Sequence, residues 1–133
     1  MKIKLRGTLF ATTFDTLSKV LVDFWGEGLM SRVRIFGEEI HYANDQLSFY
    51  CYSSLENLYN DNRENFLVDV EHVCEDNEFA IFLNDFISAL NKSEIVYEFE
   101  HVRESIEGLA LEEETIIRHP EYIKYWNNSN ELR

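Results

Sequence analysis

The sequence predicts one α+β domain over residues 1–126, in which a mixed β-sheet carries helices mainly on one face. Three observations favour this class. Two kinds of pattern follow each other along the chain. In one, apolar and polar residues alternate, as is typical of strands; in the other, apolar residues recur at helical spacing. The length of 133 residues suits a single domain with its own core. Two similar stretches, VDVEHVCED at 68–76 and YEFEHVRES at 97–105, flank an amphipathic helix, as in a crossover unit.

The first expected strand covers residues 3–11, where apolar side chains alternate with basic ones and Gly7 interrupts the pattern. A helix is expected over 14–25, because its apolar residues fall on one face. Thr12 or Thr13 can cap its start, and two glycines follow its end.

A second strand is expected over 32–42, with a bulge or bend at Gly37. The turn-forming stretch ANDQ then predicts a hairpin into the aromatic strand LSFYCYS. A short helix, opened by Ser53 or Ser54 and ending at Tyr59, is expected next.

The two similar stretches predict strands at 66–73 and 95–102, each with an apolar face and an acidic face. The stretch DNEFAIFLNDFISALNKS between them predicts a helix, capped by Asp76 or Asn77. The two strands are therefore expected to be parallel in one sheet under this helix. An alternative makes 66–73 helical within a more antiparallel sheet, because its apolar residues also satisfy helical spacing.

Towards the end of the chain, ESIEGLALEEETIIR at 104–118 favours a helix over an extended piece. Pro120 suits the first turn of a last short helix, and residues 127–133 are expected to form a frayed tail. The order of the elements matches an extended ferredoxin-like split β-α-β arrangement.

The chain has 12 Lys and Arg residues against 25 Asp and Glu residues, a formal net charge of −13. This balance opposes binding to nucleic acids and to anionic membranes, and it favours basic partners. The first twenty residues lack the apolar core of a signal peptide, and no stretch is long and apolar enough to span a membrane. Cys51 and Cys74 are expected to be reduced thiols in the cytoplasm, with a disulfide between them as the alternative.

No motif of a known catalytic site is present: the sequence has no GxSxG elbow, no phosphate-binding glycine loop and no Rossmann fingerprint. A metal site is the alternative explanation of the repeat, with His72 and His101 about 5 Å apart on adjacent strands and Glu75 or Glu104 as a further ligand. We favour packing, because the two histidines lack the spacing of a known metal motif. We therefore expect a protein that is not an enzyme and has no metal or other cofactor.

The surface is then the candidate functional feature. Carboxylates at strand positions and in the run 112–114 are expected on solvated faces, where they can attract a cationic protein. Tyrosines combine apolar bodies with polar tips and are favoured in protein interfaces. The candidate partner-binding residues are Glu38, Glu39, Tyr50, Tyr52, Tyr59, Asp69, Glu71, Glu98, Glu100, Glu112, Glu113 and Glu114.

In size, charge and lack of catalytic motifs, and in stretches such as GEEIHY, SFYCYSSLENLYND and LALEEETIIRHPEY, the chain resembles small acidic immunity proteins. Bacteria keep such proteins in the cytoplasm against polymorphic or contact-dependent growth-inhibition toxins. The resemblance implies tight one-to-one binding to a cognate basic toxin domain, such as a nuclease. Two alternatives remain: an acidic DNA mimic that inhibits a nucleic-acid-binding defence protein, and a small enzyme with a histidine and carboxylate site.

Overall fold

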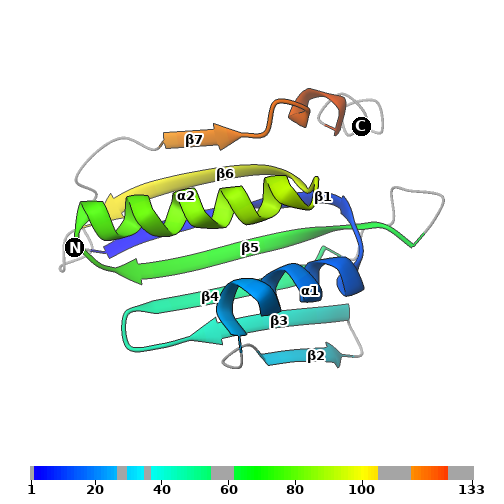
Figure 1. The fold of residues 1–133 in the computed structure, drawn as a ribbon, viewed down its shortest axis with the longest axis horizontal. Coiled ribbons are helices and arrows are strands. Elements are labelled where there is room, and N and C mark those ends of the chain that lie inside the picture. The colour runs from blue at the N-terminus through cyan, green and yellow to red at the C-terminus, as the bar shows by residue number, and fades with distance from the viewer. Residues whose placement is uncertain (1, 27–29, 35–36, 55–61, 105–114, 126–133) are drawn as a thin grey trace.

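The computed structural model describes residues 2–26, 30–34, 37–54, 62–104 and 115–125. The elements in chain order are β1 (Lys2–Thr12), α1 (Phe14–Trp25), β2 (Met30–Arg34), β3 (Gly37–Ala43), β4 (Leu47–Ser53), β5 (Glu64–Val73), α2 (Asp76–Lys92), β6 (Val96–Glu104) and β7 (Thr115–Arg118). A helical turn at 122–125 follows β7. Both helices lie on one face of the sheet, α2 over its middle and α1 towards the β3 side (Figure 1). The prediction of an α+β fold with helices on one face is confirmed.

The strands form one sheet in the order β2-β3-β4-β5-β1-β6-β7. The two similar strands, β5 and β6, run parallel to each other as expected, but β1 lies between them and pairs antiparallel with both. The sheet is therefore antiparallel and not mixed as expected, because every hydrogen-bonded pair of neighbouring strands in the described chain is antiparallel. The unit β5-α2-β6 is a split crossover with β1 in its gap.

A ferredoxin-like core is visible inside this sheet. Strands β1, β4, β5 and β6, with helices α1 and α2, have the spatial order β6-β1-β5-β4. The β2–β3 hairpin is inserted between α1 and β4 and extends one edge, while β7 extends the other. Because β1 is central, its side chains on the face away from the helices lie among those of β5 and β6.

Local sequence signals explain the ends of the helices. The hydroxyl of Thr13 accepts a hydrogen bond from the Thr16 N–H at 3.2 Å, so α1 starts where the sequence predicts. Gly26 ends α1 with a φ of 71°, a left-handed conformation that glycine adopts without strain. Helix α2 begins with a capping box between Glu75 and Glu78, and the prediction of Asp76 or Asn77 as the cap is wrong by one or two residues.

Two further predictions are corrected by the structure. The segment 32–42 is not one bent strand but a hairpin, in which β2 pairs antiparallel with β3 and Gly37 begins the second strand. Residues 115–118 form the edge strand β7 instead of a helix, because their backbone pairs with β6. The expected helix through Tyr59 and the tail at 127–133 lie outside the described residues.

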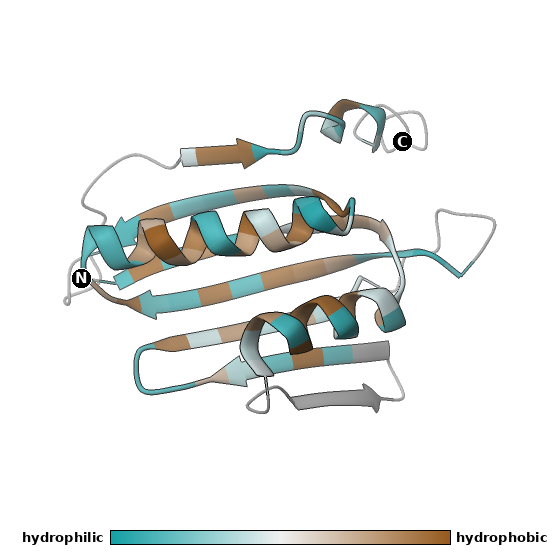
Figure 2. Ribbon diagram, in the orientation of Figure 1, coloured by the Kyte–Doolittle hydropathy of each residue, from teal (hydrophilic) through white to brown (hydrophobic). Residues whose placement is uncertain are grey.

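The core lies between the helices and the sheet and is rich in aromatic rings. Phe86 of α2 is fully buried, and its ring centroid lies 5.7 Å from those of both Phe24 and Phe99 and 5.8 Å from that of Phe49. Hydropathy alternates along the strands, as expected for a sheet with only one face in the core (Figure 2). Cys51 and Cys74 are buried free thiols, in agreement with the predicted reduced state.

Gly7 is part of β1 and does not break it. Its register partners are Val68 of β5 and Phe99 of β6. A Cβ atom at this position would overlap the main-chain carbonyl of Glu98 and the ring of Phe99. Glycine is therefore required here because β1 and β6 approach each other closely.

Candidate functional site

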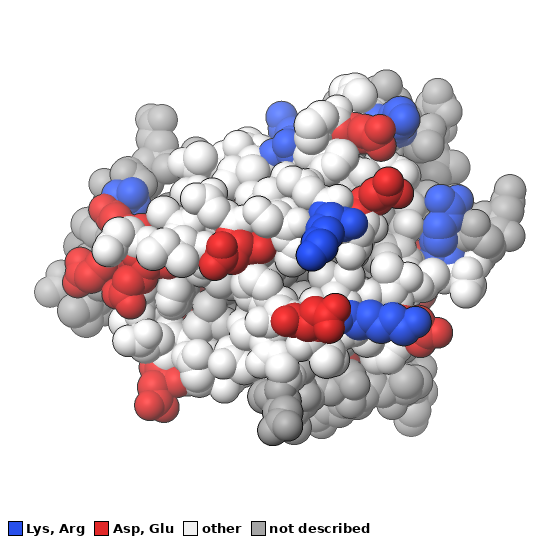
Figure 3. Space-filling view, in the orientation of Figure 1, with Lys and Arg blue, Asp and Glu red and all other residues white. Residues whose placement is uncertain are grey.

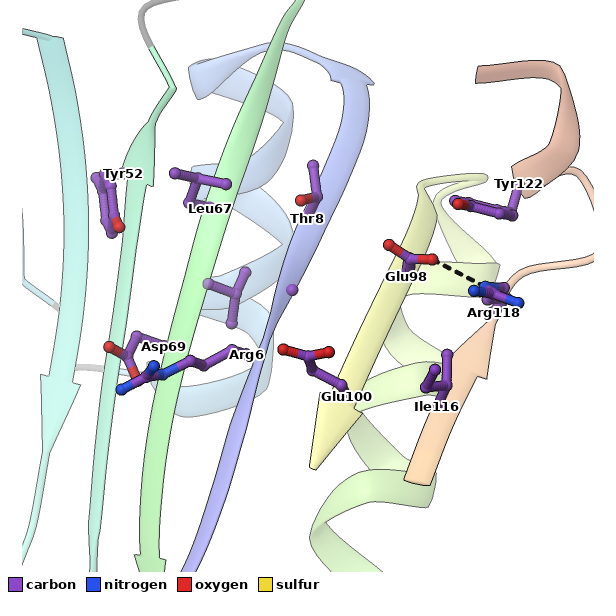
Figure 4. A pocket seen from close by; sticks show the side chains of 12 residues that line it. Arg6, Thr8, Tyr52, Leu67, Asp69, Glu98, Glu100, Ile116, Arg118 and Tyr122 are labelled. Atoms are coloured by element: carbon purple, nitrogen blue, oxygen red, sulfur yellow. Dashed lines mark hydrogen bonds and ion pairs between the residues drawn. The ribbon is translucent and has the colours of Figure 1, made fainter. Parts of the chain in front are cut away.

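The candidate site is the face of the sheet opposite the two helices, which we call the open face. Side chains at alternate positions of the strands point to it, because successive residues of a strand point to opposite sides. Its described members include Lys2, Lys4, Arg6 and Thr8 of β1, Glu39 and His41 of β3, Tyr50 and Tyr52 of β4, Leu67, Asp69 and Glu71 of β5, Glu98, Glu100 and Glu104 of β6, and Ile116 and Arg118 of β7. Figure 4 shows the middle of this face.

The fold gathers the described candidate residues on this one face. Seven of the twelve are present there: Glu39, Tyr50, Tyr52, Asp69, Glu71, Glu98 and Glu100. Glu38 belongs to β3, but its side chain is outside the described part of the chain. Tyr59 and residues 112–114 are likewise outside it.

One candidate differs from the expected solvated carboxylate. Glu39 is only 4% exposed, and the Tyr50 hydroxyl donates a hydrogen bond to its Oε2 atom. The Tyr50 ring in turn lies 5.3 Å from that of Tyr52, centroid to centroid. Glu39 therefore holds the Tyr50 hydroxyl in place, while Tyr52, at 37% exposure, is the more accessible ring.

The carboxylates of the open face are interleaved with cations. Lys2 lies 3.5 Å from Glu71, and Arg6 lies 3.7 Å from Asp69, both across the β1–β5 pair. Across the β1–β6 pair, Lys4 lies 3.5 Å from Glu104. At the β6–β7 pair, Arg118 donates to Glu98 at 2.8 Å. Two acidic columns thus flank the cationic column of β1.

These exposed ion pairs contribute little to the stability of the fold. The Arg6 and Asp69 side chains are 63% and 46% exposed, and exposed pairs contribute roughly 0–1 kcal/mol each. Within the four strands from β5 to β7, five described carboxylates face four cations, so the open face is close to neutral. Much of the acidic excess lies elsewhere, for example at Asp76 and Glu78 in the first turn of α2, the acidic end of the helix-bearing side (Figure 3).

A hollow of about 820 Å³ lies in the middle of the open face. Strands β4, β5, β1, β6 and β7 contribute to its floor, and the helical turn at 122–125 contributes one wall. The lining residues are Arg6, Gly7, Thr8, Tyr52, Leu67, Val68, Asp69, Glu98, Glu100, Ile116, Arg118 and Tyr122. The hollow therefore combines two guanidinium groups, three carboxylates and two phenol rings.

The wall at 122–125 is held by aromatic and charged contacts. The Tyr122 ring lies 5.8 Å from that of Phe10, and the Tyr125 ring stacks on Phe10 at 5.6 Å. The guanidinium of Arg118 lies 4.9 Å above the centre of the Tyr122 ring, a cation–π contact. Burial and a hydrogen bond to Glu98 raise the pKa of the Tyr122 phenol above its ordinary value.

The structure contradicts the geometry on which a metal site between His72 and His101 would depend. The strands that carry them are separated by β1, where His72 is in register with Ile3 and His101 with Leu5. Both imidazoles face the helix side, where the ring centroids of His72 and His101 lie 6.2 and 5.2 Å from that of Phe79. In the described part of the chain, no group of three or more His, Cys, Asp or Glu side chains is placed to hold a metal ion.

His72 is a buried imidazole, and we expect it to weaken folding on acidification. Burial against Phe79 and Phe82 lowers its pKa, and the nearby Glu78 carboxylate opposes this shift only in part. The unfolded chain therefore binds a proton at about pH 6.5 that the folded chain does not. The free energy of unfolding should fall as the pH drops below 6.5, by up to about 1.4 kcal/mol per pH unit.

Urea titrations at pH 7.5 and 5.5 measure this effect. A His72→Leu variant should lose that part of the pH dependence, while a variant at the half-buried His119, His119→Gln, should keep it. An unchanged pH dependence in His72→Leu would show that other groups cause the acid sensitivity.

Three charged or aromatic residues that line the hollow, Arg6, Arg118 and Tyr122, were not among the predicted site residues. The alternation of basic and apolar residues in β1 signals that Arg6 and its even-numbered neighbours share one face, but not that β1 lies between the two acidic strands. Arg118 and Tyr122 were missed for another reason: residues 115–118 were expected in a helix, which hides the pairing of Arg118 with Glu98. The pairing across distant segments is the information that one sequence lacks.

Comparison of the chain with protein-family models, with curated proteins and with solved structures gave no match. Neither α1 nor α2, the helices that the structure describes in full, has the length and apolar character needed to cross a membrane.

Proposed function

We propose that this protein is a cytoplasmic inhibitor of the immunity type, which neutralises a cognate basic toxin domain by binding it one-to-one on the open face. The observation that supports this most is the gathering of Tyr50, Tyr52 and the strand carboxylates on one sheet face around a hollow, with both helices on the other side. Aromatic anchors beside a recess are the usual centre of a protein interface.

The open face has the dimensions of a stable interface. Seven strands spaced by about 4.8 Å span about 29 Å, and seven residues of strand at about 3.3 Å each span about 23 Å. The product, roughly 670 Å², is close to the roughly 800 Å² that each partner buries in a standard complex. A docked domain would therefore cover most of the face.

The net charge of the whole chain supports a basic partner. With a net charge of −13, the protein attracts a cationic domain over a long range and accelerates their encounter. A toxin that acts on nucleic acid holds phosphates in a basic groove, and an acidic protein that occupies this groove excludes the substrate. The cationic column of β1 between the two acidic columns disfavours the DNA-mimic alternative, since phosphate lines of a duplex carry no such cations between them.

The test begins by identifying the protein domain encoded beside this chain, which we expect to be basic, and then uses that domain as the binding partner. We expect nanomolar binding, and the double variant Tyr52→Ala with Asp69→Asn should weaken it by about 100-fold, because each truncation in an interface centre costs on the order of 1–2 kcal/mol. The matched control, Ile81→Ala with Asp85→Asn, changes the outer side of α2 and should leave affinity unchanged. Surface plasmon resonance and protection of cells from the toxin are the two measurements.

The same experiment at several salt concentrations examines the electrostatic part. The association rate should fall steeply between 10 and 200 mM salt, because added salt shortens the Debye length and screens the attraction between the two proteins. Loss of affinity in the α2 variant but not in the open-face variant would exclude the open face as the binding surface.

A further inference from the structure

The floor of the hollow contains one uncharged row of side chains. Leu67 of β5 is in register with Tyr52 of β4 on one side and with Thr8 of β1 on the other. Figure 4 shows these three side chains next to one another, with Arg6 and Asp69 in the adjacent row. Thr8 and Leu67 are shorter than the charged and aromatic side chains around them, so the open face is recessed at this row.

The charged groups around this row already have partners within the protein. The Nε atom of Arg6 lies 3.7 Å from Asp69, and that of Arg118 lies 2.8 Å from Glu98. Glu100, the third carboxylate of the lining, also has an interaction of its own. A charged group from a partner would have to break one of these pairs or enter without a counter-ion, and both cost free energy. The recess therefore favours a neutral group.

The accessible ring of the row favours an aromatic group over an aliphatic one. Tyr52 is 37% exposed, and a ring placed over Leu67 can contact it edge to face. Such a contact adds affinity beyond the burial of apolar area, which is all that an aliphatic group gains. A donor on the entering ring can also form a hydrogen bond with the Thr8 hydroxyl. The indole of tryptophan meets these conditions, and tryptophan is enriched among the residues that contribute most to binding at interface centres.

We propose that the recess over Tyr52, Leu67 and Thr8 receives a tryptophan side chain of the partner protein and leaves the surrounding ion pairs intact. This inference rests on the proposed function and names the partner group that anchors the complex. The net charge of −13 acts over a long range and accelerates the encounter, whereas the neutral anchor slows dissociation. The two effects are therefore separable by salt, which screens only the first.

The test titrates the full chain with the capped tripeptide Gly-Trp-Gly and follows amide shifts by NMR. We expect saturable, millimolar binding with shifts centred on β4, β5 and β1 beside the recess. Gly-Leu-Gly and Gly-Arg-Gly are the matched ligand controls and should bind at least about threefold more weakly. The affinity for the tryptophan peptide should change by less than about twofold between about 20 and about 500 mM salt, because the peptide carries no charge.

Variants of the row separate the anchor from a general effect on the open face. Tyr52→Ala should weaken binding of the tryptophan peptide by about three- to tenfold, whereas Tyr52→Phe, which keeps the ring, should stay within about twofold of the parent. Thr8→Phe fills the recess with a ring of the chain itself and should abolish the saturable shifts. Ser48→Phe adds the same ring at an exposed position of the open face of β4, outside the hollow, and should bind like the parent.

Three results would overturn the inference: no saturable shifts at the recess, a leucine or arginine peptide that binds as tightly as the tryptophan peptide, or unchanged binding by Tyr52→Ala. The amide spectrum of each variant reports whether it is folded, and Tyr52→Ala decides if Thr8→Phe is not. The proposed function is tested separately by the toxin domain. If that domain binds the open face while the tryptophan peptide does not bind, only the anchor fails; if the peptide binds as expected and the domain does not, the inhibitor function fails.

Discussion

Phe86→Ala should lower the free energy of unfolding by about 4 kcal/mol, because it removes a fully buried ring at the contact between both helices and the sheet. The ring centroids of Phe24 of α1, Phe49 of β4 and Phe99 of β6 all lie within 5.8 Å of that of Phe86. These large neighbours cannot close the space that the ring leaves, so the cavity term adds to the lost transfer free energy.

Urea unfolding followed by far-UV circular dichroism measures this loss. Ile81→Ala is the matched control, because Ile81 is on the same helix but 62% exposed, and it should change stability by less than about 0.5 kcal/mol. Since the free energy of unfolding of a small domain is about 5–15 kcal/mol in total, Phe86→Ala should leave a protein that folds but is only marginally stable. A loss below about 1 kcal/mol would mean that this aromatic cluster is not the core of the domain.

Gly7→Ala should cost about 3 kcal/mol or more, although it adds a single methyl group. The added Cβ overlaps the Glu98 carbonyl and the Phe99 ring, so β1 and β6 must move apart and weaken their ladder. The change also displaces the floor of the hollow, since Gly7 lines it. We therefore expect a loss of stability together with NMR amide shifts along the floor of the hollow.

Gly26→Ala is an informative comparison for this second prediction. Gly26 has open space around its Cα but a φ of 71°, so alanine there should cost only about 1 kcal/mol of backbone strain. Thr8→Ala, next to Gly7 but with its side chain on the open face, should cost less than about 1 kcal/mol. If Gly7→Ala is no worse than Gly26→Ala, the close approach of β1 and β6 is not what requires glycine.

Local signals were sufficient to predict much of the fold. The helical periodicity of apolar residues and the capping threonine predicted α1 from Phe14 to Trp25. Turn-forming residues predicted the hairpin at Asn44, whose Oδ1 accepts hydrogen bonds from the N–H groups of Gln46 and Leu47. The two similar strands and the helix between them were also predicted. In each case residues close in sequence determine the structure.

Predictions failed where contacts between segments distant in sequence determine the structure. The pairing of β7 with β6 overrides the helical tendency of TIIR. The insertion of β1 between β5 and β6 separates the two histidines that the metal-site alternative placed side by side. For the candidate site, side-chain parity predicted correctly that Asp69, Glu71, Glu98 and Glu100 share the non-helix face. The cations among them were not predicted, because only the strand order places β1 there.

The central position of β1 also affects how the chain folds during translation. During translation residues 2–12 leave the ribosome long before residues 64–73 and 96–104, to which they hydrogen-bond on both sides. Both edges of β1 therefore stay unpaired for most of synthesis. The centre of the sheet can form completely only when β6 has emerged. We expect a folding rate limited by this late closure and a nascent chain that depends on chaperones, as contacts of long sequence separation generally imply.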